Sequence, residues 1–186
     1  MSLYIPPKLT YEDLLDFPAD GKRYEIIGGE LFVAASPSVA HQRLLLRIYH
    51  AFFQILQIPG WGEIFLAPLD VKLSESDVVE PDLIAIRSDN RVIIQKTHIS
   101  GVPNILLEVI SFHNRRHDEA TKRTLYASFG IPEYWLADSV NPGIRGLTLR
   151  DGVYHEIPPE SDGRIRSVVA PDLILDPAVM LDNLDF

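Results

Sequence analysis

The stretch Asn104–Ile110, NILLEVI, is apolar at almost every position and contains one carboxylate, Glu108. A second run, Pro81–Ile86 with the sequence PDLIAI, contains Asp82 in the same way. Runs of this kind are typical of central strands that are buried on both faces of a sheet. A buried carboxylate is costly unless it is paired, hydrogen-bonded or bound to a metal. The two runs therefore predict core strands that carry a polar site.

Shorter elements surround these two strands. Apolar residues at three- and four-residue spacing and capping signals predict three helices, over Thr10–Phe17, Val39–Gln57 and Asp118–Phe129. Alternating patterns between turns predict strands over Arg23–Ile27, Glu30–Val33, Glu63–Ala67, Leu69–Leu73, Glu133–Ala137, Gly146–Arg150, Val153–Ile157 and Ile165–Val169. The first two strands flank Gly28-Gly29, which indicates a hairpin. We therefore expect the α/β (α+β) class: a mixed central sheet flanked by helices, with an N-terminal hairpin and a β-rich C-terminal tail.

Composition limits the possible functions. The chain has 186 residues, a formal net charge of −9 and no cysteine, which excludes a disulfide scaffold, a thiolate zinc site and a cysteine nucleophile. Its length predicts a single domain over residues 1–186, with a core at about 11–138 and strands in 139–186. Without a long apolar run or a basic-then-apolar start, we expect a cytoplasmic protein that does not bind membranes. The acidic balance argues against a general nucleic-acid coat, so any nucleic-acid contact would be local or bridged by a metal.

The two strand carboxylates suggest a metal site. Asp82 and Glu108 offer hard oxygen ligands that suit Mg²⁺ or Mn²⁺, and the backbone carbonyl of Val109 could add a third ligand. The alternative is that Asp82 caps a turn after Pro81 and that Glu108 pairs with a surface arginine. The pattern alone favours neither interpretation.

A possible basic partner follows the second of these strands. Asp118, Lys122 and Tyr126 lie four residues apart, so they share one face of the helix predicted after Glu108. Such a helix could direct Lys122 back at the carboxylates, where it would orient an attacking water or neutralise charge on a phosphoryl oxygen. The spacing alone favours the alternative, an ordinary Asp–Lys pair on a solvated helix.

Six motifs in order identify a family. They are Arg23–Glu30, Pro37 with His41, Glu80–Leu83, Leu107–Ser111, Asp118 with Lys122 and Tyr126, and Pro132–Asp138. Together they resemble the Uma family of restriction-endonuclease-like proteins in the PD-(D/E)XK nuclease superfamily, from about Tyr11 to Asp138. The resemblance implies a restriction-endonuclease-like core with a divalent metal on its acidic residues.

The resemblance also implies roles for individual residues. Asp82 is the aspartate of the PD element, and Glu108 is the first residue of the (D/E)XK element. The sequence departs from the superfamily pattern two residues after Glu108, where Ile110 replaces the lysine. In the Uma group the lysine has moved to the following helix, which corresponds to Lys122. This requires a helix that begins almost at once and folds back over the end of the strand.

Further positions have two interpretations each. Glu25 matches another acidic position of the family and would complete the metal shell or hold a metal-bound water; the alternative is a strand-edge carboxylate paired with Arg23. His41 could contact a phosphate or act in proton transfer, and a capping or packing role is equally favoured. Asp70 is a further, less favoured candidate for an acidic residue in or near the site. Tyr134 and Trp135, by contrast, are more typical of core aromatics than of base-stacking groups.

Three functions follow from these observations. The first is a metal-dependent endonuclease that hydrolyses phosphodiester bonds in DNA, with Mg²⁺ or Mn²⁺ as cofactor and a homodimer as the expected assembly. The second is an inactive nuclease-fold module that binds nucleic acid or protein, and the third is a dimerising domain whose apolar tail covers an edge or a partner. A DNA-binding face would have to come from local basic residues: Lys72, Arg87, Arg91, Lys96, Arg115, Arg116, Lys122 and Arg123.

Overall fold

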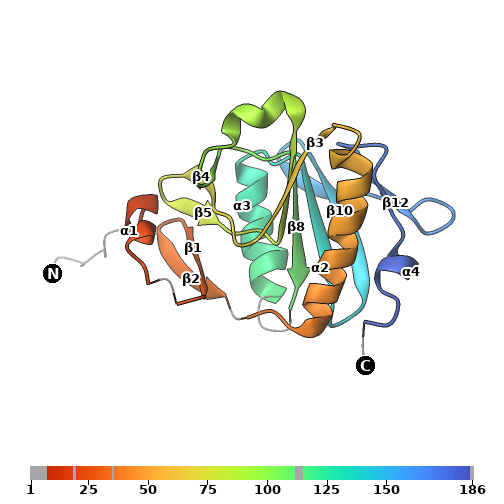
Figure 1. Ribbon diagram of the computed structural model, residues 1–186, viewed down its shortest axis with the longest axis horizontal. Helices are drawn as coiled ribbons and strands as arrows, with labels where there is room; N and C mark the ends of the chain where they lie inside the picture. Colours follow the sequence, from red (N-terminus) through yellow and green to blue (C-terminus); the bar gives the residue numbers. More distant parts are fainter. Residues whose placement is uncertain (1–7, 19, 35, 112–114, 185–186) are drawn as a thin grey trace.

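The run at 104–110 forms strand β8 (Ile105–Ile110), which lies inside a six-stranded sheet of the computed structural model (Figure 1). The structure describes residues 8–18, 20–34, 36–111 and 115–184. β8 pairs parallel with β9 (Glu133–Asp138) and antiparallel with β6 (Leu83–Arg87). All six residues of β8 are buried, as its apolar sequence predicts. The sheet is therefore mixed, and the expected fold class is confirmed.

The remaining strands of this central sheet lie outside the β6–β8–β9 core. β3 (Gly62–Leu66) forms one edge beside β6, and β10 (Gly143–Arg150) and β11 (Val153–Glu156) extend the other side, in the order β11-β10-β9-β8-β6-β3. The predicted strand 146–150 is thus three residues longer at its start. Because β10 pairs with β9 and β11 pairs with β10, the region after residue 138 completes the sheet.

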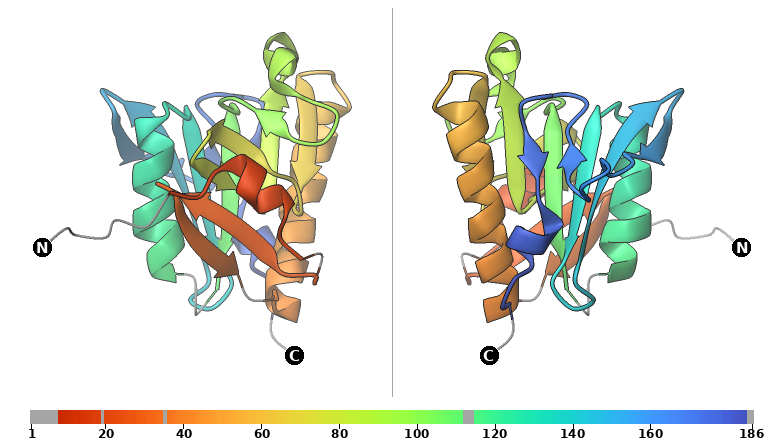
Figure 2. Two further views of the ribbon diagram at one scale, coloured as in Figure 1. Left: turned by 90° about the vertical axis from the view of Figure 1, so that its left-hand side faces the viewer. Right: turned by 90° about the vertical axis from the view of Figure 1, so that its right-hand side faces the viewer.

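One face of the central sheet is covered by α2 (Val39–Phe52) and the C-terminal segment (Figure 2). Ser38 caps α2, since its side chain accepts a hydrogen bond from the backbone N–H of His41. The single helix expected over 39–57 is wrong in its last turn, because Phe53–Gln57 form the π-helix η1. The side chain of Gln57 there accepts a hydrogen bond from the N–H of Ile64 on β3, which ties this turn to the sheet edge.

The opposite face is covered by α3 (Arg123–Ser128), by the π-helix η3 (His117–Lys122) that precedes it, and by a second sheet. The second sheet contains the predicted hairpin and has the order β2 (Glu30–Ala34), β1 (Arg23–Ile27), β5 (Asp77–Val79), β4 (Val71–Ser74) and β7 (Ile99–Ser100). A helix expected over 118–129 is therefore a π-helix followed by an α-helix. Side chains alternate along β8: Leu107 and Val109 face α2, and Leu106 and Ile110 face α3. By this alternation Glu108 faces α3.

Four short elements complete the fold, together with α1 (Tyr11–Leu15), whose N-cap Thr10 forms a capping box with Asp13. They are η2 (Ser88–Ile93), β12 (Ile165–Arg166), β13 (Ile174–Leu175) and α4 (Pro177–Met180). Of the strand expected over 165–169, only the first two residues form a strand, which is β12. Leu173 and Leu175 of the tail pack in the protein's own core rather than remaining free for a partner. No helix among the described residues is long and apolar enough to cross a membrane.

Glu133, the first residue of β9, holds the tail against the sheet. It is fully buried, and its carboxylate accepts hydrogen bonds from the Trp135 indole N–H, the Ser167 hydroxyl and the backbone N–H groups of Val168 and Val169, at 2.6–3.0 Å. We expect Glu133→Ala to lower the free energy of unfolding by about 3 kcal/mol, because several buried donors lose their acceptor. Chemical denaturation measures this loss.

The control for this prediction is Glu156→Ala, which removes a carboxylate whose side chain is 63% exposed. It should cost less than about 1 kcal/mol. Limited proteolysis should also cut the tail of the Glu133 variant earlier than that of the control. Equal stabilities of the two variants would contradict the anchoring role of Glu133.

Candidate active site

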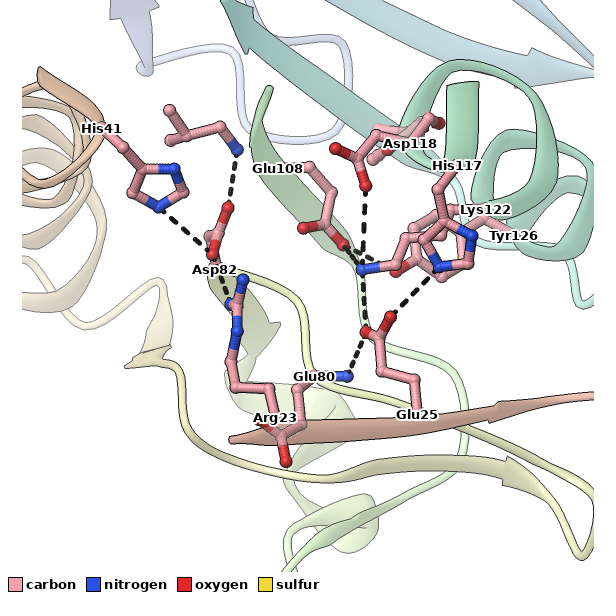
Figure 3. A network of polar contacts seen from close by, with 12 residues as sticks. Arg23, Glu25, His41, Glu80, Asp82, Glu108, His117, Asp118, Lys122 and Tyr126 are labelled. Carbon is pink, nitrogen blue, oxygen red and sulfur yellow. Dashed lines mark hydrogen bonds and ion pairs between the residues drawn. The ribbon is translucent and has the colours of Figure 1, made fainter. Parts of the chain in front are cut away.

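The five residues singled out as catalytic candidates meet around one small cavity beside the α3 face of the central sheet (Figure 3). Each is at most 4% exposed: Glu25 on β1, His41 in the first turn of α2, Asp82 directly before β6, Glu108 on β8 and Lys122 at the end of η3. The cavity is about 20 Å³, enough for roughly one water molecule or ion. Elements from both sheets and two helices are needed to build it.

The side chain of Asp82, which precedes β6, is hydrogen-bonded to the end of the neighbouring strand β8. Its Oδ2 accepts a hydrogen bond from the backbone N–H of Val109 at 2.8 Å, and its Oδ1 lies 2.7 Å from Nη1 of Arg23. Nε2 of His41 lies 3.5 Å from the same Oδ1. Burial would raise the pKa of Asp82, but His41 and Arg23 outweigh it and hold the pKa well below its usual range. The interpretation of Asp82 as a local turn cap is therefore wrong.

Lys122 lies between two carboxylates. Its Nζ is 2.8 Å from Oε1 of Glu25 and 2.8 Å from Oε1 of Glu108. Burial would lower the pKa of Lys122, but the charges of Glu108 and Glu25 raise it far above its usual range, so the side chain is an ammonium ion. The solvated-helix alternative, which the spacing had favoured, is wrong, because Lys122 and Asp118 are both buried.

Glu108 is tied to the helical face that follows its strand. In addition to Lys122, its Oε1 accepts a hydrogen bond from the Tyr126 hydroxyl at 2.9 Å. Burial and the charges of Asp82 and Glu25 raise the pKa of Glu108, against the opposing effect of Lys122. The predicted pairing of Glu108 with a surface arginine is wrong. The spacing of Lys122 and Tyr126 thus brings both side chains to one carboxylate.

Glu25 does not pair with Arg23. Its Oε1 accepts a hydrogen bond from the backbone N–H of Glu80 at 2.8 Å, and its Oε2 lies 3.2 Å from Nε2 of His117. Burial would raise the pKa of Glu25, but Lys122 and His117 outweigh it and lower the pKa to about 2. The strand-edge alternative is therefore wrong, and Glu25 contacts the same ammonium group of Lys122 as Glu108 does.

Five residues of this cluster had not been proposed as catalytic or metal-binding residues: Arg23, Glu80, His117, Asp118 and Tyr126. Asp118 and Tyr126 lie four residues from Lys122, a spacing that the sequence already showed, whereas the other three carried no such signal. Asp118 is 3% exposed, and burial together with the charge of Glu108 raises its pKa to about 8. Asp70 does not line the cavity. Tyr134 and Trp135 are fully buried, which confirms them as core aromatics.

The donor chemistry of the cavity fits a hard divalent cation. Four buried carboxyl groups line it: Glu25, Asp82, Glu108 and Asp118. Of the other residues that line it, Arg23 and Lys122 are positively charged, and oxygen-rich acidic sites suit Mg²⁺ or Mn²⁺. Within the described residues, no three Asp, Glu or His side chains are already arranged to hold a metal ion. The Lys122 ammonium instead supplies the positive charge between Glu25 and Glu108.

The basic residues expected to form a DNA-binding face are largely engaged elsewhere. Lys122 is buried, and four others form ion pairs: Lys72 with Glu75, Arg87 with Asp89, Arg91 with Glu63, and Arg115 with Asp138. Five of the eight are therefore not free to form a positive surface.

Comparisons with known proteins identify the family and a similar fold. The chain is similar in structure to the crystal structure of "a putative nuclease belonging to DUF820" from Anabaena variabilis ATCC 29413, with a TM-score of 0.78 and 15% sequence identity over 95% of this chain and 99% of that one. The two proteins thus share one fold. The chain belongs to the Uma2 family, described as "Putative restriction endonuclease", whose model it matches over residues 11–178. The match includes most of the C-terminal region that the resemblance left out. No curated protein matches the chain.

Proposed function

We propose that this protein is a metal-dependent endonuclease that hydrolyses phosphodiester bonds in DNA. The observation that carries the proposal is the contact between Lys122 and Glu108, at 2.8 Å, in a cavity that Asp82 also lines. Lys122 lies beside the carboxylates of Glu25 and Glu108. It does so although Ile110 occupies the position two after Glu108, where the superfamily pattern has its lysine. Membership of a family described as restriction-endonuclease-like supports the reaction class, and DNA as substrate rests on that family resemblance.

Asp82, Glu108 and the backbone carbonyl of Val109 would hold the cation, Mg²⁺ or Mn²⁺. The hydrogen bond from the N–H of Val109 to Asp82 supports this set, because it ties the aspartate to the strand that carries the other two ligands. A bound divalent cation would polarise a phosphoryl oxygen and make water more acidic. The protein's own contribution is to hold these oxygen atoms rigidly on two adjacent strands.

Lys122 would act on the reacting phosphate. Its ammonium remains charged in the cavity, so it can orient the attacking water or stabilise the negative charge that develops on the phosphoryl oxygens. Glu25 positions the lysine through its Oε1, and His117 in turn contacts Glu25. His41 lies against Asp82, where it would contact the phosphate or move a proton. Each proposed role therefore corresponds to a contact in the cluster.

The proposal predicts cleavage of supercoiled plasmid DNA by the purified protein in Mn²⁺ or Mg²⁺, and no cleavage in EDTA. Agarose gel electrophoresis separates nicked, linear and supercoiled forms, and a structured RNA assayed in parallel tests the choice of DNA. Binding of DNA without cleavage in either metal would contradict the proposal and favour the inactive module. The expected homodimer remains a prediction, which analytical ultracentrifugation with and without DNA would test.

A further inference from the structure

A second and larger pocket lies directly beside the acidic cavity. Its volume is about 310 Å³, and it shares Arg23, His41 and Asp82 with the cavity. This volume is at the lower end of the range for pockets that bind small molecules. We call it the side pocket. A chemical group joined to a phosphate at the boundary of the two spaces could therefore lie in the side pocket.

The walls of the side pocket are chiefly apolar. Pro37, just before α2, Leu45, in the middle of α2, and Leu66 and Pro68, at the end of β3 and just after it, supply much of this surface. His41 is the only ring-bearing side chain other than proline among the residues that line it. Such walls fit the apolar faces of a flat heterocycle of modest size.

Polar groups are confined to a few positions. Gln42 is exposed, and its side-chain amide can both donate and accept hydrogen bonds, as the edge of a nucleobase requires. Arg23 lines both spaces and pairs with Asp82, and Lys22, which lines only the side pocket, pairs with Asp20, so neither adds a free positive charge. Apolar walls beside an exposed amide match the faces and the edge of one nucleobase.

We propose that the side pocket binds a nucleobase of the cleaved strand, unstacked from its neighbours, next to the phosphate that is hydrolysed. This inference rests on the proposed function, because it takes the acidic cavity as the position of the cation and places the phosphate where the cavity meets the side pocket, beside Arg23, His41 and Asp82. A base is joined to its phosphate through a single sugar, so the two adjoining spaces can hold one nucleotide. Bases in a duplex are stacked inside the helix, so the base must leave the stack, and burial between apolar side chains offsets that cost.

The experiment uses a short DNA duplex in which every purine is 2-aminopurine paired with thymine, so that a fluorescent base is present in every register. Stacking quenches this base, and extrusion from the duplex restores its fluorescence. The full-length protein is titrated into the duplex in Ca²⁺, and anisotropy of a terminal dye reports binding in the same samples. We expect binding to raise the 2-aminopurine fluorescence severalfold, since no aromatic carbocycle lines the side pocket to quench it.

Gln42→Phe tests the location of the base. Gln42 lines the side pocket but not the acidic cavity, so the larger side chain should narrow only the former. We expect it to abolish most of the fluorescence rise, because the phenyl ring fills the space or stacks on a base that still enters it. Leu46→Phe is the matched control, since Leu46 lies one turn further along α2, is 64% exposed and lines neither space. It should behave as the wild type does.

The outcomes separate this proposal from the proposed function. The proposal for the side pocket would be overturned if the fluorescence rose equally with the wild type and with Gln42→Phe, or if the wild type bound DNA without a rise. In either case plasmid cleavage would still test hydrolysis. A rise that depends on Gln42, without plasmid cleavage by any variant, would support the side pocket and overturn hydrolysis. Absence of DNA binding by the wild type would overturn the side pocket as well, and the plasmid assay would show whether hydrolysis fails with it.

Discussion

Replacing Lys122 with methionine is expected to lower the free energy of unfolding of the metal-free protein by about 3–5 kcal/mol. The ammonium lies 2.8 Å from both Glu25 and Glu108, and all three side chains are at most 5% exposed. Methionine fills a similar volume, so the loss comes from the two carboxylates that remain buried without a cation. Urea denaturation followed by circular dichroism would measure the change.

The same variant should separate metal binding from catalysis. Its oxygen ligands are intact and the competing ammonium is gone, so it should bind Mn²⁺ at least as tightly as the wild type in calorimetry. Its rate of DNA hydrolysis should fall by about 100–1,000-fold, the usual cost of losing a group that stabilises transition-state charge. Mn²⁺ should also restore more stability to the variant than to the wild type, because a cation again lies among the carboxylates.

A lysine in a different environment provides the control. Lys72 pairs with Glu75 at 2.7 Å, but the Glu75 side chain is 70% exposed, so Lys72→Met should cost less than about 1 kcal/mol and leave hydrolysis unchanged. Wild-type stability in the Lys122 variant would mean that the ammonium does not neutralise the buried carboxylates. Wild-type hydrolysis would remove Lys122 from the reaction.

The central strands and one part of the site could be predicted from local sequence. β6 and β8 were recognisable because strands buried on both faces have nearly continuous apolar sequences. The same apolar background made Asp82 and Glu108 conspicuous. Residues next to one another in sequence or in helical spacing, such as Lys122 and Tyr126, could also be grouped before their common partner was known.

Burial of the helix after β8 could not be predicted in this way. The spacing of Asp118 and Lys122 is the same on a solvated helix and on one that packs against a sheet, and only the second sheet, which brings Glu25 to Lys122, distinguishes the two. The π-helical turns at Phe53–Gln57 and His117–Lys122 are equally invisible, because apolar spacing does not specify the hydrogen-bond register. These features depend on contacts between segments far apart in the chain.

Glu133 shows that a buried carboxylate in an apolar strand can have a structural role instead of a role in a candidate active site. It carries the same sequence signal as Asp82 and Glu108, but its partners are the tail's backbone N–H groups, Ser167 and Trp135. Such a carboxylate is saturated by neutral donors and has a structural role. Glu108, by contrast, shares its cavity with other carboxyl groups and a lysine. The donors around a buried acid, rather than its burial, indicate which role applies.

Asp82→Asn is expected to reduce Mn²⁺ affinity and DNA hydrolysis by at least about a hundredfold each, since even partners that only support a metal ligand are worth 10–100-fold. The asparagine keeps the size of the side chain and can still accept the hydrogen bond from Val109. It loses the negative charge that a divalent cation requires, and it leaves Arg23 without its carboxylate partner. We therefore expect a folded variant that is less stable by about 1–3 kcal/mol. Calorimetric titration of Mn²⁺ and the plasmid assay measure the two effects separately.

Asp70→Asn is the matched control, because it makes the same chemical change at a partly buried aspartate that does not line the cavity. If both variants lose stability but only the Asp82 variant loses Mn²⁺ binding, the loss cannot come from general weakening of the fold. Unchanged Mn²⁺ affinity in Asp82→Asn would exclude Asp82 as a ligand. Binding would then have to come from Glu108, Glu25 and Asp118, whose carboxyl groups all approach Lys122. In that case Lys122→Met would change metal affinity more than any substitution of Asp82, so the two variants together decide which carboxylates bind the metal.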